Sequence, residues 1–264
     1  MSKAIHLGHG IILFKGAADI DENELHAYLG DLEAKTTPQD YRKEEATGRL
    51  VSDGGYEYDS DSIAKAPLRY TNTVFESISE EGVRLIQGLE DVFYSCLVTY
   101  CRNFPVAIND IKWRTRGYVI RYENGQGIGP HSDTSIPYTG DGLDSETIHP
   151  ALNTLTGGIF LNQDYAGGTI LFRPWGIRVN PEKGDALIYP SSFIGCHEVQ
   201  PVTEGVRYAY LTWFGHGQTN MIQPPNSTDQ GLHMIVKRVH DLRKDVGDEF
   251  SYQKDILVGE LRNK

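Results

Sequence analysis

Cysteine and long apolar runs are scarce in this sequence, and each shortage excludes a class of protein. The 264 residues include three cysteines, Cys96, Cys101 and Cys196, which cannot form a paired disulfide framework and are interpreted as thiols in a reducing compartment. No stretch approaches the roughly 18 consecutive apolar residues of a membrane span. Residues 1–16 contain no cleavage site of a secretory signal. We therefore expect a cytoplasmic protein that neither spans a membrane nor depends on disulfides.

Positive charge is also in short supply. The chain has 25 Lys and Arg residues against 36 Asp and Glu residues, a formal net charge of −11, and no run rich in Lys or Arg. The resulting field repels the phosphates of a nucleic acid. The charge balance therefore predicts no nucleic-acid partner, and it leaves the oligomeric state open.

The remaining composition is that of an ordinary globular protein. Hydrophobic residues make up 39% and charged residues 23% of the chain, and neither an internal repeat nor a linker rich in Pro and Ser divides it. We expect a single domain over residues 1–264. Within it, residues 1–105 would provide helical support and a lid loop, residues 106–216 a β core with the chemically important motifs, and residues 217–264 a helical tail.

The first 105 residues contain signals for two helices and one strand. Residues 11–15 (IILFK) resemble a strand, and Asp21 followed by Glu24 resembles a capping box that opens a helix through about Lys35. Residues 36–73 are polar and have no sustained period, which predicts a long loop able to act as a lid. Residues 79–101 place apolar side chains at helical spacing behind Ser79 as N-cap, which predicts one long amphipathic helix.

After Pro105 the sequence changes to short β-like runs separated by Gly, Pro and Asn. We expect eight strands, within residues 117–122, 128–133, 157–163, 168–173, 176–180, 185–190, 193–199 and 206–214. Such a pattern is typical of a jelly roll or double-stranded β-helix. The predicted fold class is therefore mainly β with flanking helices (α+β), and residues 229–264 return to a charged helical pattern.

One pair of residues in the β region has the spacing of metal ligands. Side chains two positions apart in a strand point to the same face, so His131 and Asp133 can reach one metal ion together. This short pattern also arises by chance, and a third ligand is needed. His197 lies 64 residues beyond Asp133 on a later β-like run, which a jelly roll can bring alongside. Two His and one carboxylate make up the facial triad of non-haem Fe(II) oxygenases.

A basic residue follows the last candidate ligand. Arg207 comes ten residues after His197, on what the pattern predicts to be the next strand. Its guanidinium could hold a carboxylate through two parallel hydrogen bonds, as an organic-acid cosubstrate would require.

The region from about Trp113 to Gly215 resembles the catalytic domain of the prolyl 4-hydroxylase-like family of Fe(II)- and 2-oxoglutarate-dependent oxygenases. Four stretches and one tryptophan carry the resemblance: residues 122–133 (YENG to HSD), 160–172 (FLN, then GGTILF), 181–189 (PEKGDALIY), 197–207 (HEVQPVTEGVR) and Trp213. Their common order along the chain makes a chance match an implausible explanation.

The resemblance implies a role for each matching residue. His131, Asp133 and His197 would bind Fe(II), and Arg207 would pair with the distal carboxylate of 2-oxoglutarate. Tyr122 and Trp213 would line the same pocket, with Trp213 facing the substrate. The implied reaction uses O2, with ascorbate as a supporting reductant. It hydroxylates a C–H bond of an amino-acid-like substrate, either a prolyl residue, a free amino acid or a small metabolite, and releases succinate and CO2.

Three positions depart from the family pattern. Ile128 replaces a Tyr, Arg207 stands where Lys is usual, and Asn153 falls near a position at which many members carry Arg. The last departure concerns substrate binding, so the substrate stays open. Two other classes also stay open: a cupin-type metal-dependent hydrolase or isomerase, and a non-catalytic jelly-roll binding module.

The two longest predicted loops are interpreted as lids. Residues 36–73 and 134–156 are longer than simple connectors, and the second begins directly after the candidate ligand Asp133. We expect both to close over the substrate.

Overall fold

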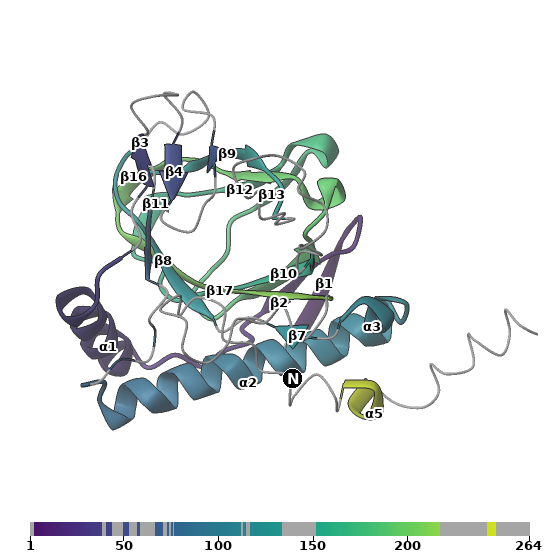
Figure 1. The fold of residues 1–264 in the computed structure, drawn as a ribbon, viewed down its shortest axis with the longest axis horizontal. Helices are drawn as coiled ribbons and strands as arrows, with labels where there is room; N and C mark the ends of the chain where they lie inside the picture. The colour runs from purple at the N-terminus through teal and green to yellow at the C-terminus, as the bar shows by residue number, and fades with distance from the viewer. Residues whose placement is uncertain are drawn as a thin grey trace, which may run out of the picture.

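The protein is a roll of β-strands supported on one side by helices. The computed structural model describes residues 3–38, 41–43, 50–52, 57–58, 67–70, 73, 75, 77–111, 113–114, 117–133, 152–216 and 242–246. Figure 1 shows the strands curving around a common interior, with helices α1 (Glu22–Lys35) and α2 (Glu80–Asn103) beneath them. Among these residues, no helix combines the length and apolar character that crossing a membrane requires.

The larger sheet forms the lower wall of the roll. Its strands lie in the order β1-β2-β14-β10-β17-β8-β6, and β7 also pairs with β17. Their bounds are β1 (Lys3–Gly8), β2 (Ile11–Lys15), β6 (Leu68–Tyr70), β7 (Trp113–Arg114), β8 (Tyr118–Tyr122), β10 (Leu152–Phe160), β14 (Ala186–Pro190) and β17 (Arg207–His216). All of these pairings are antiparallel. The strand order also makes neighbours of strands that are far apart in sequence, such as β2 and β14.

A smaller sheet faces the larger one across the interior (Figure 1). It has the order β13-β12-β15-β9, with β13 (Ile177–Val179), β12 (Ile170–Phe172), β15 (His197–Val199) and β9 (Ile128–His131). A two-stranded sheet of β11 (Tyr165–Gly167) and β16 (Val202–Gly205) lies nearby, and short 3-10 turns at η2 (Arg173–Trp175) and η3 (Phe193–Gly195) connect strands. The mainly β class with flanking helices is confirmed.

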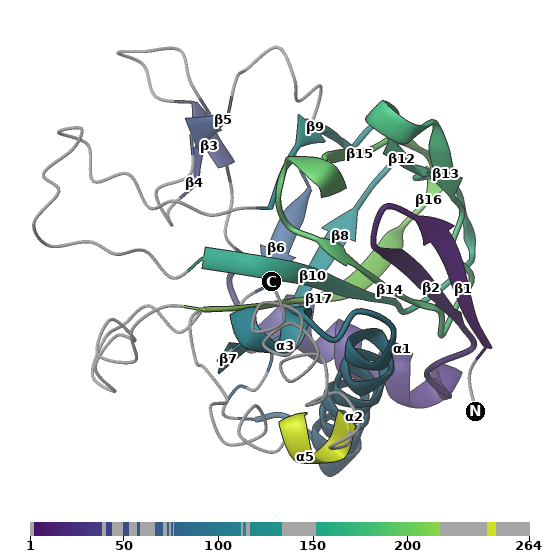
Figure 2. The same cartoon turned by 90° about the vertical axis from the view of Figure 1, so that its right-hand side faces the viewer.

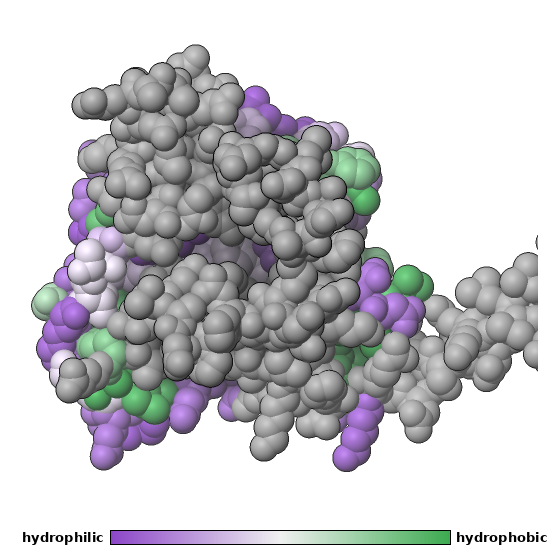
Figure 3. All heavy atoms as spheres, in the orientation of Figure 1, coloured by the Kyte–Doolittle hydropathy of each residue, from purple (hydrophilic) through white to green (hydrophobic). Residues whose placement is uncertain are grey.

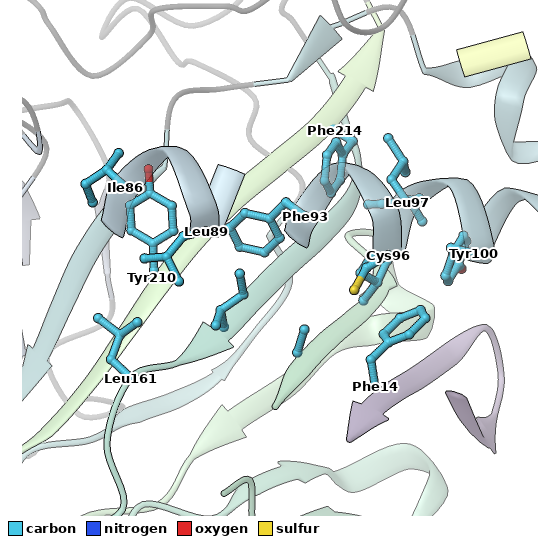
Figure 4. Close-up of a cluster of buried hydrophobic side chains, with 14 of the residues drawn as sticks. Phe14, Ile86, Leu89, Phe93, Cys96, Leu97, Tyr100, Leu161, Tyr210 and Phe214 are labelled. Atoms are coloured by element: carbon cyan, nitrogen blue, oxygen red, sulfur yellow. The ribbon is translucent and has the colours of Figure 1, made fainter. Parts of the chain in front are cut away.

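The outer face of the larger sheet forms the main apolar core with α2. Phe93, which is fully buried near the middle of α2, packs its ring 5.8 Å from that of Tyr210 and 6.4 Å from that of Phe214 (Figure 4). The opposite side of this amphipathic helix is polar, and Figure 3 shows hydrophilic side chains projecting along the lower edge of the molecule, where α2 lies. Burial of its apolar face therefore fixes α2 against the sheet.

The two helices and the strand predicted within the first 105 residues are confirmed. Asp21 caps α1, because its Oδ1 accepts hydrogen bonds from the backbone N–H groups of Asn23 at 2.9 Å and Glu24 at 3.0 Å. Ser79 caps α2 in the same way, its Oγ accepting from the N–H of Gly82 at 3.1 Å. These contacts satisfy donors that a helix N-terminus would otherwise leave without a partner.

The prediction of one long loop over residues 36–73 is wrong. The segment contains β3 (Tyr41–Lys43), β4 (Leu50–Ser52) and β5 (Glu57–Tyr58), which form an antiparallel sheet that stands apart from the roll in Figure 2. It also contains β6, which joins the edge of the larger sheet. These strands are two or three residues long, too short for a period of two to be recognised.

Other differences concern short elements and segment ends. Strands β1, β11 and β16 and helix α3 (Ala107–Asp110) were not predicted, and the predicted second loop ends earlier than expected because Leu152 already begins β10. Helix α5 (Leu242–Val246) is the part of the predicted helical tail that the structure describes. The rest of that tail and residues 134–151 of the predicted second lid lie outside the described residues.

Candidate metal centre

Two strands of the smaller sheet bring the three predicted ligands together. Strands β9 and β15 pair with His131 directly opposite His197, and the ring centroids of the two imidazoles lie 4.4 Å apart. Asp133 follows β9, and its Oδ1 is 3.6 Å from Nε2 of His131. One ligand atom from each of the three residues lies within 4.8 Å of the other two. The predicted proximity of these residues is therefore present in the fold.

Backbone carbonyls fix the orientation of both imidazoles. Nδ1 of His131 donates to the carbonyl oxygen of Gly129 at 2.8 Å, and Nδ1 of His197 donates to that of Gly195 at 3.0 Å. Because a carbonyl only accepts hydrogen bonds, these contacts select the tautomer with the proton on Nδ1. Both rings thus direct an unprotonated Nε2 toward the centre, which is the usual arrangement of metal-binding histidines.

Gly195 holds one of these carbonyls in place through a close backbone approach. A Cβ atom at this position would lie 1.8 Å from the carbonyl oxygen of Pro190, so no larger residue fits. The 3-10 turn η3 can therefore bend tightly enough to place the Gly195 carbonyl beneath His197.

Hydroxyl groups that the sequence analysis did not single out hold the carboxylate. Oγ1 of Thr156 and the hydroxyl of Tyr189 both donate to Oδ2 of Asp133, at 2.8 Å and 2.9 Å. Nδ2 of Asn153 donates to the backbone carbonyl of Asp133 at 2.8 Å. Asn153, the third departure from the family pattern, thus contacts the backbone of the candidate ligand Asp133. These contacts leave Oδ1 of Asp133 directed toward the imidazoles.

Electrostatic coupling among the three side chains shifts the pKa of each. Burial acts to raise the pKa of Asp133, but its interactions with His131 and His197 and the hydrogen bond from Thr156 outweigh it and hold the pKa below its usual range. Burial and the neighbouring His131 lower the pKa of His197 to about 4. The carboxylate is therefore charged and His197 neutral near pH 7, as metal coordination requires. The pKa of His131 is instead raised, because Asp133 outweighs the effect of burial.

Arg207 is a buried cation beside the triad. Its side chain is 2% exposed, and the guanidinium carbon lies 4.8 Å from the ring centroid of Tyr122 and 5.3 Å from that of Phe160. Within the described part of the chain, no carboxylate forms an ion pair with it, and its buried Nε has no hydrogen-bond partner. Burying such a charge is costly unless an anion accompanies it. Arg207 opens β17, and the intervening strand β16 was not expected.

Tyr122 and Trp213 both point into the roll. Tyr122 lies directly across from Arg207 in the β8–β17 pair, and Trp213 lies across from Thr156 in the β10–β17 pair. Directly opposite residues of an antiparallel pair share a face, so Trp213 occupies the same side as the hydroxyl that holds Asp133. The period-2 alternation of β10 and β14 also places Thr156 and Tyr189 on the inner face, and that signal could have identified them.

The chemistry of these groups fits Fe(II) and a dicarboxylate. Two neutral imidazole nitrogens and one carboxylate oxygen are the facial set found in non-haem Fe(II) oxygenases. A buried guanidinium whose charge has no partner among the described residues provides a site for the far end of an acidic cosubstrate. His131, Asp133 and His197 could therefore hold the metal, and Arg207 the cosubstrate.

Comparison with known proteins identifies the region that contains this centre. Residues 117–215 match the model of the 2OG-Fe(II) oxygenase superfamily. A PKHD-type hydroxylase of Alteromonas mediterranea is 36% identical over 98 residues, covering 35% of this chain and 40% of the relative. One of Phenylobacterium zucineum is 34% identical over 97 residues, with the same coverage. The match thus spans about two fifths of the length of these curated relatives.

A solved structure shares the fold of this chain. The prolyl hydroxylase of Trichoplax adhaerens, in complex with a hypoxia inducible factor peptide fragment, superposes with a TM-score of 0.53 at 16% identity and covers 78% of this chain and 84% of its own. The predicted double-stranded β-helix is therefore confirmed. Residues 117–215, which contain the candidate metal centre, are thus similar to the 2OG-Fe(II) oxygenase superfamily.

Proposed function

We propose that this protein is an Fe(II)- and 2-oxoglutarate-dependent dioxygenase that hydroxylates a C–H bond of an amino-acid-like substrate. The observation that carries the proposal is the combination of the His131, Asp133 and His197 cluster with the buried cation of Arg207. A metal site alone fits many activities. A metal site beside a buried guanidinium is the arrangement that an iron-bound organic acid requires.

The residues of the chain hold and orient the reactants in this proposal. Nε2 of His131, Nε2 of His197 and Oδ1 of Asp133 bind Fe(II). Arg207 holds the distal carboxylate of 2-oxoglutarate, with Tyr122 beneath its guanidinium. Bound Fe(II) and 2-oxoglutarate supply the oxidation by O2, in which one oxygen atom enters the substrate and the other enters succinate while CO2 leaves.

The surroundings of the centre control water and ligand geometry. Tyr189 and Thr156 fix the carboxylate of Asp133 through Oδ2, so Oδ1 is presented to the metal in one orientation. Apolar side chains on the inner strands, including Ile120, Phe160 and Phe172, are almost fully buried. They keep the reacting C–H bond away from bulk water.

The two other classes require less of the site than the fold provides. A cupin-type hydrolase or isomerase could use the three ligands with another metal but has no need of a buried guanidinium. A binding module needs no ligand triad. The superfamily match favours the oxygenase over both.

The substrate of the proposed reaction is a prolyl residue, a free amino acid or a small metabolite. The test incubates the purified protein with Fe(II), 2-oxoglutarate and ascorbate and adds a panel of free amino acids and peptides. We expect succinate to form with at least one of them and the product to gain the mass of one oxygen atom. The variant His197→Ala serves as the control that lacks a ligand. Absence of 2-oxoglutarate binding and of succinate in the wild-type protein would refute the proposal.

A further inference from the structure

Arg207, the residue proposed to hold 2-oxoglutarate, stands at the very start of its strand. It is the first residue of β17 and comes two residues after Gly205, which ends β16 with a φ of 73°. The ends of secondary-structure elements open more readily than their middles. A guanidinium that holds a carboxylate through two parallel hydrogen bonds nevertheless needs a fixed position. The backbone around Arg207 therefore needs support on both of its sides.

One side of this backbone is supported by a strand and the other is not. Arg207 lies directly opposite Tyr122 in the β8–β17 pair. On the other side, β10 ends at Phe160, whose partner on β17 is Ala209. Strand β10 thus stops two positions short of Arg207, at the point where the anchor begins.

The side chain of Asn162 takes the place of the missing strand. Its Oδ1 accepts a hydrogen bond from the backbone N–H of Tyr208 at 2.9 Å, and its Nδ2 donates to the backbone carbonyl oxygen of Val206 at 2.7 Å. These two residues flank Arg207 in the chain. Asn162 is itself buried, and a buried hydrogen bond of this kind is costly to leave unmade. One amide therefore holds the backbone immediately before and immediately after the anchor.

The partners of this amide allow it a single orientation. A backbone N–H only donates and a carbonyl only accepts, so the amide oxygen must face Tyr208 and the amide nitrogen must face Val206. The second N–H of Nδ2 donates to Oδ1 of Asp164 at 2.5 Å. All three contacts require the same arrangement of oxygen and nitrogen. A carboxylate or an aliphatic side chain at position 162 could not make them all.

The side chain of Arg207 is guided by contacts beyond the backbone. A Cβ atom at Gly168 would lie 2.9 Å from Cδ of Arg207, so the aliphatic part of the arginine passes directly over this glycine. The guanidinium carbon lies 4.8 Å from the ring centroid of Tyr122 and 5.3 Å from that of Phe160. These contacts direct the head group, but they depend on where the backbone of the anchor starts.

We propose that Asn162 is a positioning residue that holds the guanidinium of Arg207 where it faces the distal carboxylate of 2-oxoglutarate. This proposal rests on the proposed function, which assigns that carboxylate to Arg207. In this role Asn162 acts through the backbone of Arg207 and not by contact with the cosubstrate. Its loss should therefore weaken a ligand that reaches Arg207 and spare a ligand that binds at the metal centre alone.

The test compares two 2-oxo acids that differ at their distal end. 2-Oxoglutarate carries a carboxylate there, whereas 2-oxopentanoate carries a methyl group. The full-length protein is loaded with Ni(II) and titrated calorimetrically with each acid. We expect Asn162→Ala to weaken 2-oxoglutarate about three- to tenfold, the range that loss of one hydrogen bond typically brings. The affinities for Ni(II) and for 2-oxopentanoate should not change.

Asn103→Ala is the matched control for this substitution. The Nδ2 of Asn103 also donates to a backbone carbonyl, that of Thr99 within α2, at 2.8 Å. This contact lies on the exposed side of the helix, so its loss should leave the binding of both acids unchanged. A fall in 2-oxoglutarate affinity in this control equal to that in Asn162→Ala would contradict a specific role for Asn162.

A double-mutant cycle shows whether Asn162 acts through Arg207. In the Arg207→Ala background, Asn162→Ala should cause no further loss of 2-oxoglutarate affinity, because the guanidinium that it positions is already absent. The paired substitution Asn162→Asp with Asp164→Asn provides a second variant of unchanged size. It keeps an acceptor for Tyr208 and a hydrogen bond between the two side chains, and it removes the donation to Val206. It should also weaken 2-oxoglutarate about three- to tenfold.

Three results would overturn the positioning role. They are unchanged 2-oxoglutarate affinity in both folded variants, equal weakening of 2-oxoglutarate and 2-oxopentanoate, and a full further loss in the Arg207→Ala background. A wild-type protein that does not bind 2-oxoglutarate would instead refute the proposed function, together with the anchor on which this inference rests. The wild-type titration therefore distinguishes failure of the function from failure of the positioning role.

Discussion

The two faces of the larger sheet are both buried, but they are built from different kinds of residue. The outer face packs apolar rings such as Phe93, Tyr210 and Phe214 against α2. The inner face includes a buried cation, Arg207, and a hydroxyl, Thr156, that holds a carboxylate. Buried polar groups cost stability unless they are matched. The difference indicates that the outer face serves stability and the inner face serves chemistry.

Removing a candidate ligand should have the largest effect on the inner face. His131→Ala and His197→Ala each delete one of three protein ligands, and we expect Fe(II) binding to be lost because two ligands do not hold the metal in this geometry. Metal titration followed by equilibrium dialysis measures the effect. Thermal unfolding of the apoproteins is the control and should change little. Wild-type affinity in both variants would contradict the assignment.

The opposite pattern is expected on the outer face. Phe93→Ala empties a fully buried site between α2 and the sheet, and a change of this kind costs about 3 to 5 kcal/mol of unfolding free energy. Denaturant unfolding measures it. Under conditions in which Phe93→Ala remains folded, it should bind Fe(II) with the affinity of the wild-type protein. Loss of metal affinity at constant stability would show that the two faces are not separable in this way.

Arg207 tests the inner face without touching the metal ligands. Losing one partner of a buried, charge-assisted pair typically costs about 2 to 5 kcal/mol, so Arg207→Ala should weaken 2-oxoglutarate at least tenfold while Fe(II) binding stays nearly intact. The affinity of Arg207→Lys for 2-oxoglutarate should lie between those of the wild-type protein and Arg207→Ala, because Lys keeps the charge but not the two parallel hydrogen bonds. The apparent KM for 2-oxoglutarate in succinate formation gives the order. An equal apparent KM in Arg207→Ala and the wild-type protein would show that another residue holds the distal carboxylate of 2-oxoglutarate.

The two long helices and the candidate ligands could be predicted from the sequence, because short sequence patterns identify them. The N-caps Asp21 and Ser79 mark the starts of both long helices, and the helical period of residues 79–101 identifies the face that covers the sheet. Motifs of fixed spacing identified His131, Asp133 and His197. The caps, the helical period and the pair His131 and Asp133 depend on residues close together in the chain, where spacing translates directly into direction. His197 was identified by the order of the family motifs along the chain.

The features that sequence analysis missed depend on pairing between distant segments. Asn162 stands just beyond the end of β10, and its contacts on either side of Arg207 form only when β17 pairs with β10. The alternation of β10 and β14 indicates which face Thr156 and Tyr189 occupy, but their contacts with Asp133 form only when the two strands pair. The lid role of residues 36–73 and 134–156 stays a prediction.

The smallest effect is expected at the hydroxyls that hold Asp133. Thr156→Val keeps the shape of the side chain and removes the donor to Oδ2, and Tyr189→Phe does the same from β14. Loss of such an orienting contact commonly weakens metal binding about 10- to 100-fold. We expect the lower end here, because each single variant keeps one of the two hydroxyl groups that donate to Oδ2 of Asp133. Tyr208→Phe is the matched control, since its hydroxyl also donates to a carboxylate, that of Glu33 on α1. Fe(II) affinity should fall in the first two variants, fall further in the double variant, and remain unchanged in the control. An unchanged Fe(II) affinity in the double variant would mean that the hydroxyl groups do not orient Asp133, and that the contact from the Asn153 side chain to the Asp133 backbone carbonyl is sufficient.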